Sequence, residues 1–176
     1  MRLPPLPADQ WDDRTRGALA ALLPRARRNP DGAGPAMSAL ARHPDLAEAY
    51  LGFGVYLLFR SSLPPRVREI AILRIAHRHH CAYEWAHHVA MAEDNGLSAA
   101  DVAGIERGEL TAEFDRLLLA AVDELDEQSH LSDTTWAALS DYLDERQRMD
   151  LVFTVGGYAM VAMAFNTFGI QPEHER

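Results

Sequence analysis

The sequence has only one cysteine, Cys81, and no lysine among its 176 residues. A single cysteine excludes an internal disulfide and fits a reducing compartment. The formal net charge is −9, and every basic side chain besides histidine is an arginine, which argues against a nucleic-acid backbone as the main partner. The first residues are rich in proline and have no apolar run typical of a signal peptide. We therefore expect a cytoplasmic protein with no nucleic-acid partner.

Long apolar runs are also scarce. The one candidate for a membrane span, residues 151–170, contains threonine, asparagine and glycine and is barely long enough to cross a bilayer. We expect a buried or interface helix there and no membrane partner. The small residues that would let another helix approach closely, for example from a second subunit, are Gly156, Gly157, Ala159 and Ala162.

Apolar residues recur at helical spacing, and no convincing alternating strand pattern is visible. Asp9 can cap a short helix, and Pro44 suits the first position of another. The expected helices cover about residues 10–23, 44–60, 82–94, 113–128, 133–142 and 145–168, with one opening at Pro64–Pro65 and one after the capping pattern Ser98-x-x-Asp101. The sequence therefore predicts an all-α fold in one domain, 1–176, with its core at about 44–170 after an N-terminal arm and a short helix.

Reactive side chains gather between Glu69 and Leu97, a stretch that holds five of the eight histidines and the only cysteine. Titratable groups set among apolar residues are costly to bury without partners, so this stretch is the candidate site for proton chemistry. Glu84 and His88 are four residues apart and share one helix face. Glu69 lies on the preceding helix and can reach that pair if the two helices pack antiparallel.

The other polar residues of this stretch have simpler interpretations. A solvated helix face is expected for His77, Arg78, His79 and His87. Trp85 and Tyr83 are expected to pack, although Tyr83 can also donate a hydroxyl hydrogen bond. A carboxylate-bridged di-metal site needs Glu-x-x-His pairs on two helices together with further glutamates. The candidate cluster instead offers one Glu-x-x-x-His (Glu84, His88) and one His-x-x-x-Glu (His80, Glu84), which is a weak metal signal, so we expect no metal. Cys81 can be either a small buried residue or a nucleophile.

Residues 68–98, REIAILRIAHRHHCAYEWAHHVAMAEDNGLS, resemble the carboxymuconolactone decarboxylase family, which includes alkylhydroperoxidases of the alkylhydroperoxidase D type. The resemblance extends over about 44–170, and residues 150–172 are similar to the C-terminal helix of larger bacterial members. It implies an all-helical, alkylhydroperoxidase D-like domain whose subunits assemble through helices as trimers or hexamers. It also implies that neither a metal nor an organic cofactor is used.

The two branches of the family differ at one position of this stretch. Alkylhydroperoxidases carry Glu-(eleven residues)-Cys-x-x-Cys-x-x-x-His, which Glu69, Cys81 and His88 match, whereas Glu84 replaces the second cysteine. In that branch Glu and His activate the second cysteine, so its loss removes the two-thiol cycle within one chain. The decarboxylase branch carries Glu-x-x-x-His followed by Gly-Leu-(Ser/Thr), as Glu84, His88 and residues 96–98 do here.

Three functions follow from the resemblance. We predict a decarboxylase-like lyase that acts on a small organic acid or lactone through acid–base catalysis. The first alternative is a peroxidase-like antioxidant oxidoreductase, in which Glu69 and His88 lower the pKa of the Cys81 thiol. The second is a non-catalytic oligomer that binds a ligand between helices. The predicted catalytic residues are Glu69, Cys81, Glu84 and His88, and the predicted substrate-binding residues are Arg74, Tyr83 and His80, with Arg68 and Arg78 as further cations for an anionic group.

Overall fold

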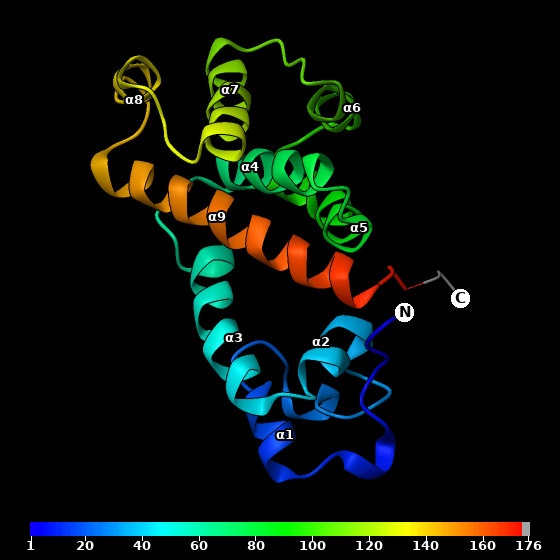
Figure 1. Ribbon diagram of the computed structural model, residues 1–176. Helices are drawn as coiled ribbons and strands as arrows, with labels where there is room; N and C mark the ends of the chain where they lie inside the picture. The colour runs from blue at the N-terminus through cyan, green and yellow to red at the C-terminus, as the bar shows by residue number, and fades with distance from the viewer. Residues whose placement is uncertain (174–176) are drawn as a thin grey trace. The chain divides into compact units, whose positions relative to one another are not determined.

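The computed structural model describes residues 1–173, and among these residues it contains helices and no strand (Figure 1). The all-α prediction is therefore confirmed. The chain divides into two compact units, which we call the N-terminal unit (Met1–Arg60 with the C-terminal residues from Phe165) and the central unit (Ser61–Ala164). The predicted core of about 44–170 includes parts of both units.

The N-terminal unit is built from helices that meet on α3. Its elements are η1 (Ala8–Gln10), α1 (Asp13–Ala18), η2 (Arg25–Arg27), α2 (Gly34–Leu40) and α3 (Pro44–Phe59). Both α1 and α2 contact α3, which begins at Pro44 as predicted. The prediction that Asp9 caps the first longer helix is wrong, because Asp9 falls inside η1. Asp12 has the extended backbone of a capping residue, and its side chain accepts a hydrogen bond from the Thr15 N–H.

The central unit is arranged around α4. Its elements are α4 (Pro65–Arg78), α5 (Ala82–Met91), η3 (Glu93–Asn95), α6 (Ala99–Arg107), α7 (Glu113–Gln128), α8 (Asp133–Leu139) and α9 (Glu145–Phe168), the last of which continues into the N-terminal unit. Figure 1 shows α5, α6 and α7 around α4, and α4 contacts all three. The large aliphatic residues of α4 that are fully buried are Ile70, Ile72, Leu73 and Ile75. An element buried on every side holds its neighbours in place, so α4 is the scaffold of the site.

A tight turn joins α4 to α5. The Cys81 N–H donates to the Ala76 carbonyl at 2.9 Å, the His80 N–H donates to the His77 carbonyl at 2.9 Å, and His80 has a φ of +51°. This pair of bonds is the usual end of a helix at a left-handed residue. The turn leads directly into α5, and α4 and α5 pack against each other.

The far end of α5 differs from the prediction. The helix ends at Met91 and not at residue 94, because residues 93–95 tighten into η3 and Gly96, with a φ of +83°, closes the turn. The predicted capping box of α6 is confirmed, since Ser98 and Asp101 each bond to the other's backbone N–H. These turns determine where the polar side chains of α5 lie.

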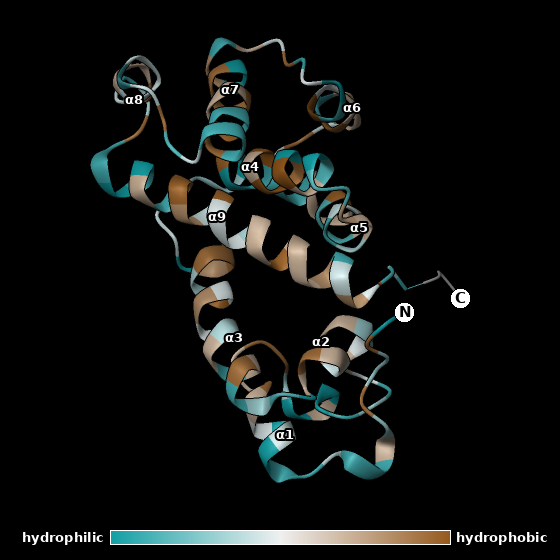
Figure 2. Cartoon of the chain, viewed as in Figure 1, coloured by the Kyte–Doolittle hydropathy of each residue, from teal (hydrophilic) through white to brown (hydrophobic). Residues whose placement is uncertain are grey.

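Helix α9 begins and ends where the sequence predicts. Figure 2 shows it mostly apolar beyond its first turn, and among the described residues it is the one helix long and apolar enough to cross a bilayer by length and composition. Of its most apolar window, 44% is buried inside the protein. Asp150 is buried on it and accepts hydrogen bonds from the Ser62 N–H at 2.6 Å and the Ser62 hydroxyl at 2.7 Å. A buried carboxylate bonded to the protein fits a helix packed against other helices.

Candidate functional site

A buried carboxylate–imidazole pair lies between α4 and α5. The side chain of Glu69 is 0% exposed and that of His88 is 5% exposed. The Nδ1 of His88 lies 2.6 Å from Oε2 of Glu69, and Oε1 of the same carboxylate accepts a hydrogen bond from Nε of Arg68 at 3.1 Å. The contact predicted between Glu69 and His88 is therefore present, and it depends on the packing of α4 against α5.

Glu84 completes the cluster from one turn earlier on α5. Its Oε2 lies 3.6 Å from Nε2 of His88, so the imidazole sits between two carboxylates. The side chain of Glu84 is 11% exposed, which makes it the most accessible of the three. Arg68, Glu69, His88 and Glu84 therefore form a chain of alternating charges, with the buried Glu69 and His88 between the more exposed Arg68 and Glu84.

The two carboxylates decide the charge of His88. Burial by itself lowers the pKa of the imidazole, but the hydrogen bonds and charges of Glu69 and Glu84 outweigh burial and raise that pKa to about 9. His88 is therefore protonated at neutral pH. Protonated in this way, it can donate a proton or stabilise negative charge on a bound molecule.

Tyr158, on α9, contacts the imidazole of His88. Its ring meets the imidazole of His88 edge-on, with centroids 5.2 Å apart and an angle of 83° between the rings, and the residue is 8% exposed. An edge-on aromatic contact restricts the orientation of the imidazole. Tyr158 was not among the predicted site residues, because residues 151–170 were expected only to pack. The available signal was a tyrosine with a polar tip among glycine and alanine neighbours.

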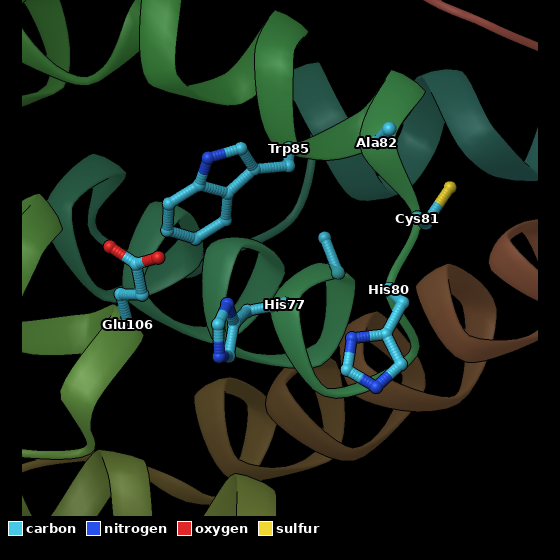
Figure 3. A pocket seen from close by; sticks show the side chains of 7 residues that line it. His77, His80, Cys81, Ala82, Trp85 and Glu106 are labelled. Carbon is cyan, nitrogen blue, oxygen red and sulfur yellow. The ribbon is translucent and has the colours of Figure 1, made fainter.

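Cys81 lies at the N-cap of α5 and is 1% exposed. Burial raises the pKa of its thiol, and the charge of Glu84 raises it further, while the backbone N–H groups of Glu84 and Tyr83 act in the opposite direction. The lowered thiol pKa expected under the peroxidase alternative is therefore wrong. Figure 3 shows the sulfur pointing away from the rings of His77 and Trp85.

The predicted substrate-binding residues lie outside this cluster. The guanidinium of Arg74 donates to both oxygens of Asp123 at 2.7 Å and to the Ile105 carbonyl at 2.9 Å. Tyr83 is buried, and its ring contacts the tilted ring of His87, with centroids 4.2 Å apart. His80 is exposed and lines a separate cavity. The structure thus brings together Glu69, Glu84 and His88, while Arg74, Tyr83 and His80 are each engaged elsewhere.

Two of the residues expected on a solvated face form ion pairs instead. Arg78 donates from Nε to Asp126 at 2.6 Å, and Nε2 of His79 lies 2.7 Å from the other oxygen of the same carboxylate. That expectation is wrong for both, because α7 presents acidic residues to the end of α4. Among residues 1–173, no three His, Cys, Asp or Glu side chains are placed to hold a metal ion.

Comparisons with known proteins agree with this architecture. Residues 44–127 match the model of the carboxymuconolactone decarboxylase family. No curated protein matches the chain. One similar solved structure is a protein of unknown function from Agrobacterium tumefaciens, a candidate antioxidant defence protein AhpD, with 20% identity, a TM-score of 0.68 and coverage of 77% of this chain and 96% of that chain.

A second similar structure is the alkylhydroperoxidase AhpD core of an uncharacterized peroxidase-related protein from Ralstonia eutropha JMP134. It is 16% identical with a TM-score of 0.79, and the match covers 98% of this chain and 94% of that chain. At these identities the likeness shows the fold and not the reaction. Residues 44–127 are therefore similar to the carboxymuconolactone decarboxylase family, and the chain has the AhpD-like helical fold of these two structures.

Proposed function

We propose that the chain is an acid–base enzyme that acts on a small organic acid or lactone, with His88 as the proton donor. One observation carries this proposal: the imidazole is bonded through Nδ1 to buried Glu69 and faces Glu84 with Nε2, so its pKa is raised to about 9. A group that is protonated at neutral pH and held in one orientation is ready to act as a general acid.

The three residues then have different roles. Glu69 orients the imidazole and stabilises its charge, as the buried carboxylate of a catalytic triad does for its histidine. Glu84 is the partly accessible carboxylate and is the group that can accept a proton from bound substrate. His88 is charged before substrate arrives, so it serves as the acid and not as the first base. His88 is also the cation that can face a bound anion, because the guanidinium of Arg68 is already bonded to Glu69 and Asn95.

A decarboxylation fits these roles. The bond between a substrate carbon and its carboxylate breaks, carbon dioxide leaves, and the electron pair moves into the conjugated system of the substrate. The imidazolium of His88 donates its proton to the carbon that gains electron density, and solvent protonates His88 again. When a double bond shifts position, one proton must be removed from the substrate and another added. Glu84 can accept the first proton, and His88 can donate the second.

The position of Cys81 supports acid–base chemistry over thiol chemistry. Its sulfur is buried and its pKa is raised, whereas a peroxidatic cysteine needs an accessible thiolate. The N–H groups of Tyr83 and Glu84 favour the thiolate, but burial opposes them more strongly. We therefore place the proton-transfer chemistry on Glu84 and His88.

Substitutions at Cys81 and Glu84 distinguish the two chemistries. With carboxymuconolactone and related unsaturated lactone acids as test substrates, Cys81→Ser is expected to keep turnover within about twofold, because the sulfur takes no part. Glu84→Gln is expected to lower turnover about 10²-fold, the contribution typical of one acid–base group. Release of carbon dioxide is the measurement. Turnover lost in Cys81→Ser, together with peroxide consumption by the unmodified protein, would contradict the proposal.

We also propose that α9 joins copies of this chain into a homo-oligomer. Its exposed side includes the residues Met149, Phe153, Gly156, Met160 and Met163, spaced alternately by four and three. This is the spacing of a helix that packs along another helix. A cavity of about 330 Å³ opens beside the same side, partly lined by Gly156 and Met163, and can receive a side chain from a second copy.

The mass in solution tests this proposal. Size-exclusion chromatography with light scattering is expected to give a multiple of the 19.6 kDa chain mass, with a trimer or hexamer expected from the family. Phe153→Glu combined with Met160→Glu is expected to lower that mass, because two charges would have to be buried in an apolar contact. Trp136→Glu, an equivalent change on α8, is the control and should leave the mass unchanged. A monomeric unmodified protein would contradict the proposal.

A further inference from the structure

A second cavity, of about 230 Å³, opens where α4 turns into α5 (Figure 3). Its lining side chains come from the end of α4, the turn, the start of α5 and the end of α6, and the four large ones are His77, His80, Trp85 and Glu106. Neither Glu84 nor His88 lines it, and the sulfur of Cys81 points away from its rings. It is therefore distinct from the proposed proton-transfer site, and it needs an explanation of its own.

Aromatic rings form the walls of this cavity. The rings of His77 and Trp85 meet with centroids 5.5 Å apart at an angle of 57°, and those of His77 and His80 lie 6.5 Å apart at 67°. Rings at such angles form a corner and not a stack. An indole face is the aromatic surface that attracts cations most strongly.

One carboxylate completes the cavity beside the indole. Figure 3 shows the Glu106 side chain next to the ring of Trp85. Among residues 1–173, no arginine lines the cavity, and Arg74, whose guanidinium bonds to both oxygens of Asp123, donates to the backbone carbonyl of Glu106 at 3.5 Å. Neighbouring carboxylates, such as those of Asp123 and Asp126, are paired with Arg74 and Arg78. A carboxylate beside aromatic rings, with no arginine from the described part of the chain in the cavity wall, is suited to a cationic ligand.

The backbone of His80 points to the same cavity. His80 occupies the left-handed position after α4, where glycine is usual, with a φ of +51°. A side chain with a Cβ is strained there, and such strain is often found where a residue serves a binding site. At this position the imidazole of His80 reaches the wall of the cavity, which a glycine would leave open.

From these features we infer that the cavity binds a small organic cation, of the class of methylated or quaternary ammonium ions. The methyl groups lie in the corner formed by Trp85 and His77, and the charge faces Glu106. The cavity is smaller than a typical drug-sized site, so the ligand is a small ion. Methylated ammonium ions lose less hydration than primary ones when they enter an aromatic corner, which is why this class is favoured.

Calorimetric titration with choline tests the inference. The unmodified protein is expected to bind choline at least fivefold more tightly than 3,3-dimethylbutan-1-ol, its uncharged analogue of nearly equal shape. Trp85→Leu and Glu106→Gln are each expected to weaken choline binding by about fivefold or more, in line with a cation–π or charge contribution of this size. Glu109→Gln, which removes an exposed carboxylate outside the cavity, is the matched control and should bind choline as before.

A second pair of variants tests the role of His80. His80→Gly is expected to weaken choline binding about threefold while raising the Tm by about 2–4 °C, because the left-handed strain is removed. Ser129→Gly relieves similar strain at a φ of +62° outside the cavity, so it should raise the Tm and leave binding unchanged. Equal binding of choline and its uncharged analogue, tighter binding of benzoate than of choline, or no binding of any probe would each overturn the inference.

Discussion

Replacing Glu69 by alanine is expected to lower the free energy of unfolding by about 3–5 kcal/mol, the cost typical of removing one partner from a buried ion pair. Glu69 is fully buried and bonds to both His88 and Arg68, so its loss leaves two cations without their shared carboxylate. Urea unfolding near pH 7 measures the change. Glu93→Ala, which removes an exposed carboxylate on η3, is the control and should change the free energy by no more than about 0.5 kcal/mol.

The same cluster makes stability depend on pH. The pKa of His88 is about 9 in the folded protein, above its ordinary value of about 6.5, so folding favours the protonated form. The stability that this gives is fully present below about pH 6.5 and is lost as pH rises through about 9. The loss amounts to about 3 kcal/mol for a shift of this size. In Glu69→Ala this loss should shrink, and an unchanged pH dependence would show that Glu69 does not hold the proton on His88.

Replacing His88 by glutamine is expected to lower turnover about 10³-fold, since it removes the proposed proton donor. Glutamine can still donate a hydrogen bond to Glu69, so the variant keeps much of the local bonding while it loses the ionisable group. Turnover of the unmodified enzyme should also fall above about pH 9, where His88 gives up its proton. His88→Gln should lack this fall in whatever activity remains.

His87 offers a control on the same helix. It is exposed, contacts the ring of Tyr83 and lies outside the charge cluster, so His87→Gln is expected to keep turnover within about twofold. Circular dichroism and urea unfolding of both variants separate loss of chemistry from loss of folding. A His88→Gln protein that is folded and turns over at the rate of the unmodified enzyme would exclude His88 as the acid.

Local signals predicted the elements that carry the site. Pro44 and Pro65 open helices, Ser98 and Asp101 form a capping box, and Glu84 and His88 share a face because helical spacing alone places them there. These features depend on residues close together in the chain, so no knowledge of packing was needed. The same reasoning placed the first helix wrongly, because Asp9 and Asp12 are both good caps and only the path of the folded chain distinguishes them.

The charges and accessibilities of the site residues were not predictable in the same way. Whether Arg74 is available to a substrate depends on Asp123, which comes from α7 and accepts hydrogen bonds from Nε and one terminal nitrogen of its guanidinium. Whether Cys81 is a reactive thiol depends on how deeply its sulfur is buried, and burial raises its pKa. Tyr158 reaches His88 from α9, 70 residues along the chain, through a contact that only helix packing creates.

The sequence by itself determined that this protein is helical, that Glu69, Glu84 and His88 are the candidate proton-transfer residues, and that no second cysteine follows Cys81. Those conclusions rest on residue identity and short-range periodicity. Only the tertiary structure decided that His88 carries a proton at neutral pH. Its protonation depends on the packing of α4 against α5, which buries the imidazole between two carboxylates and away from water.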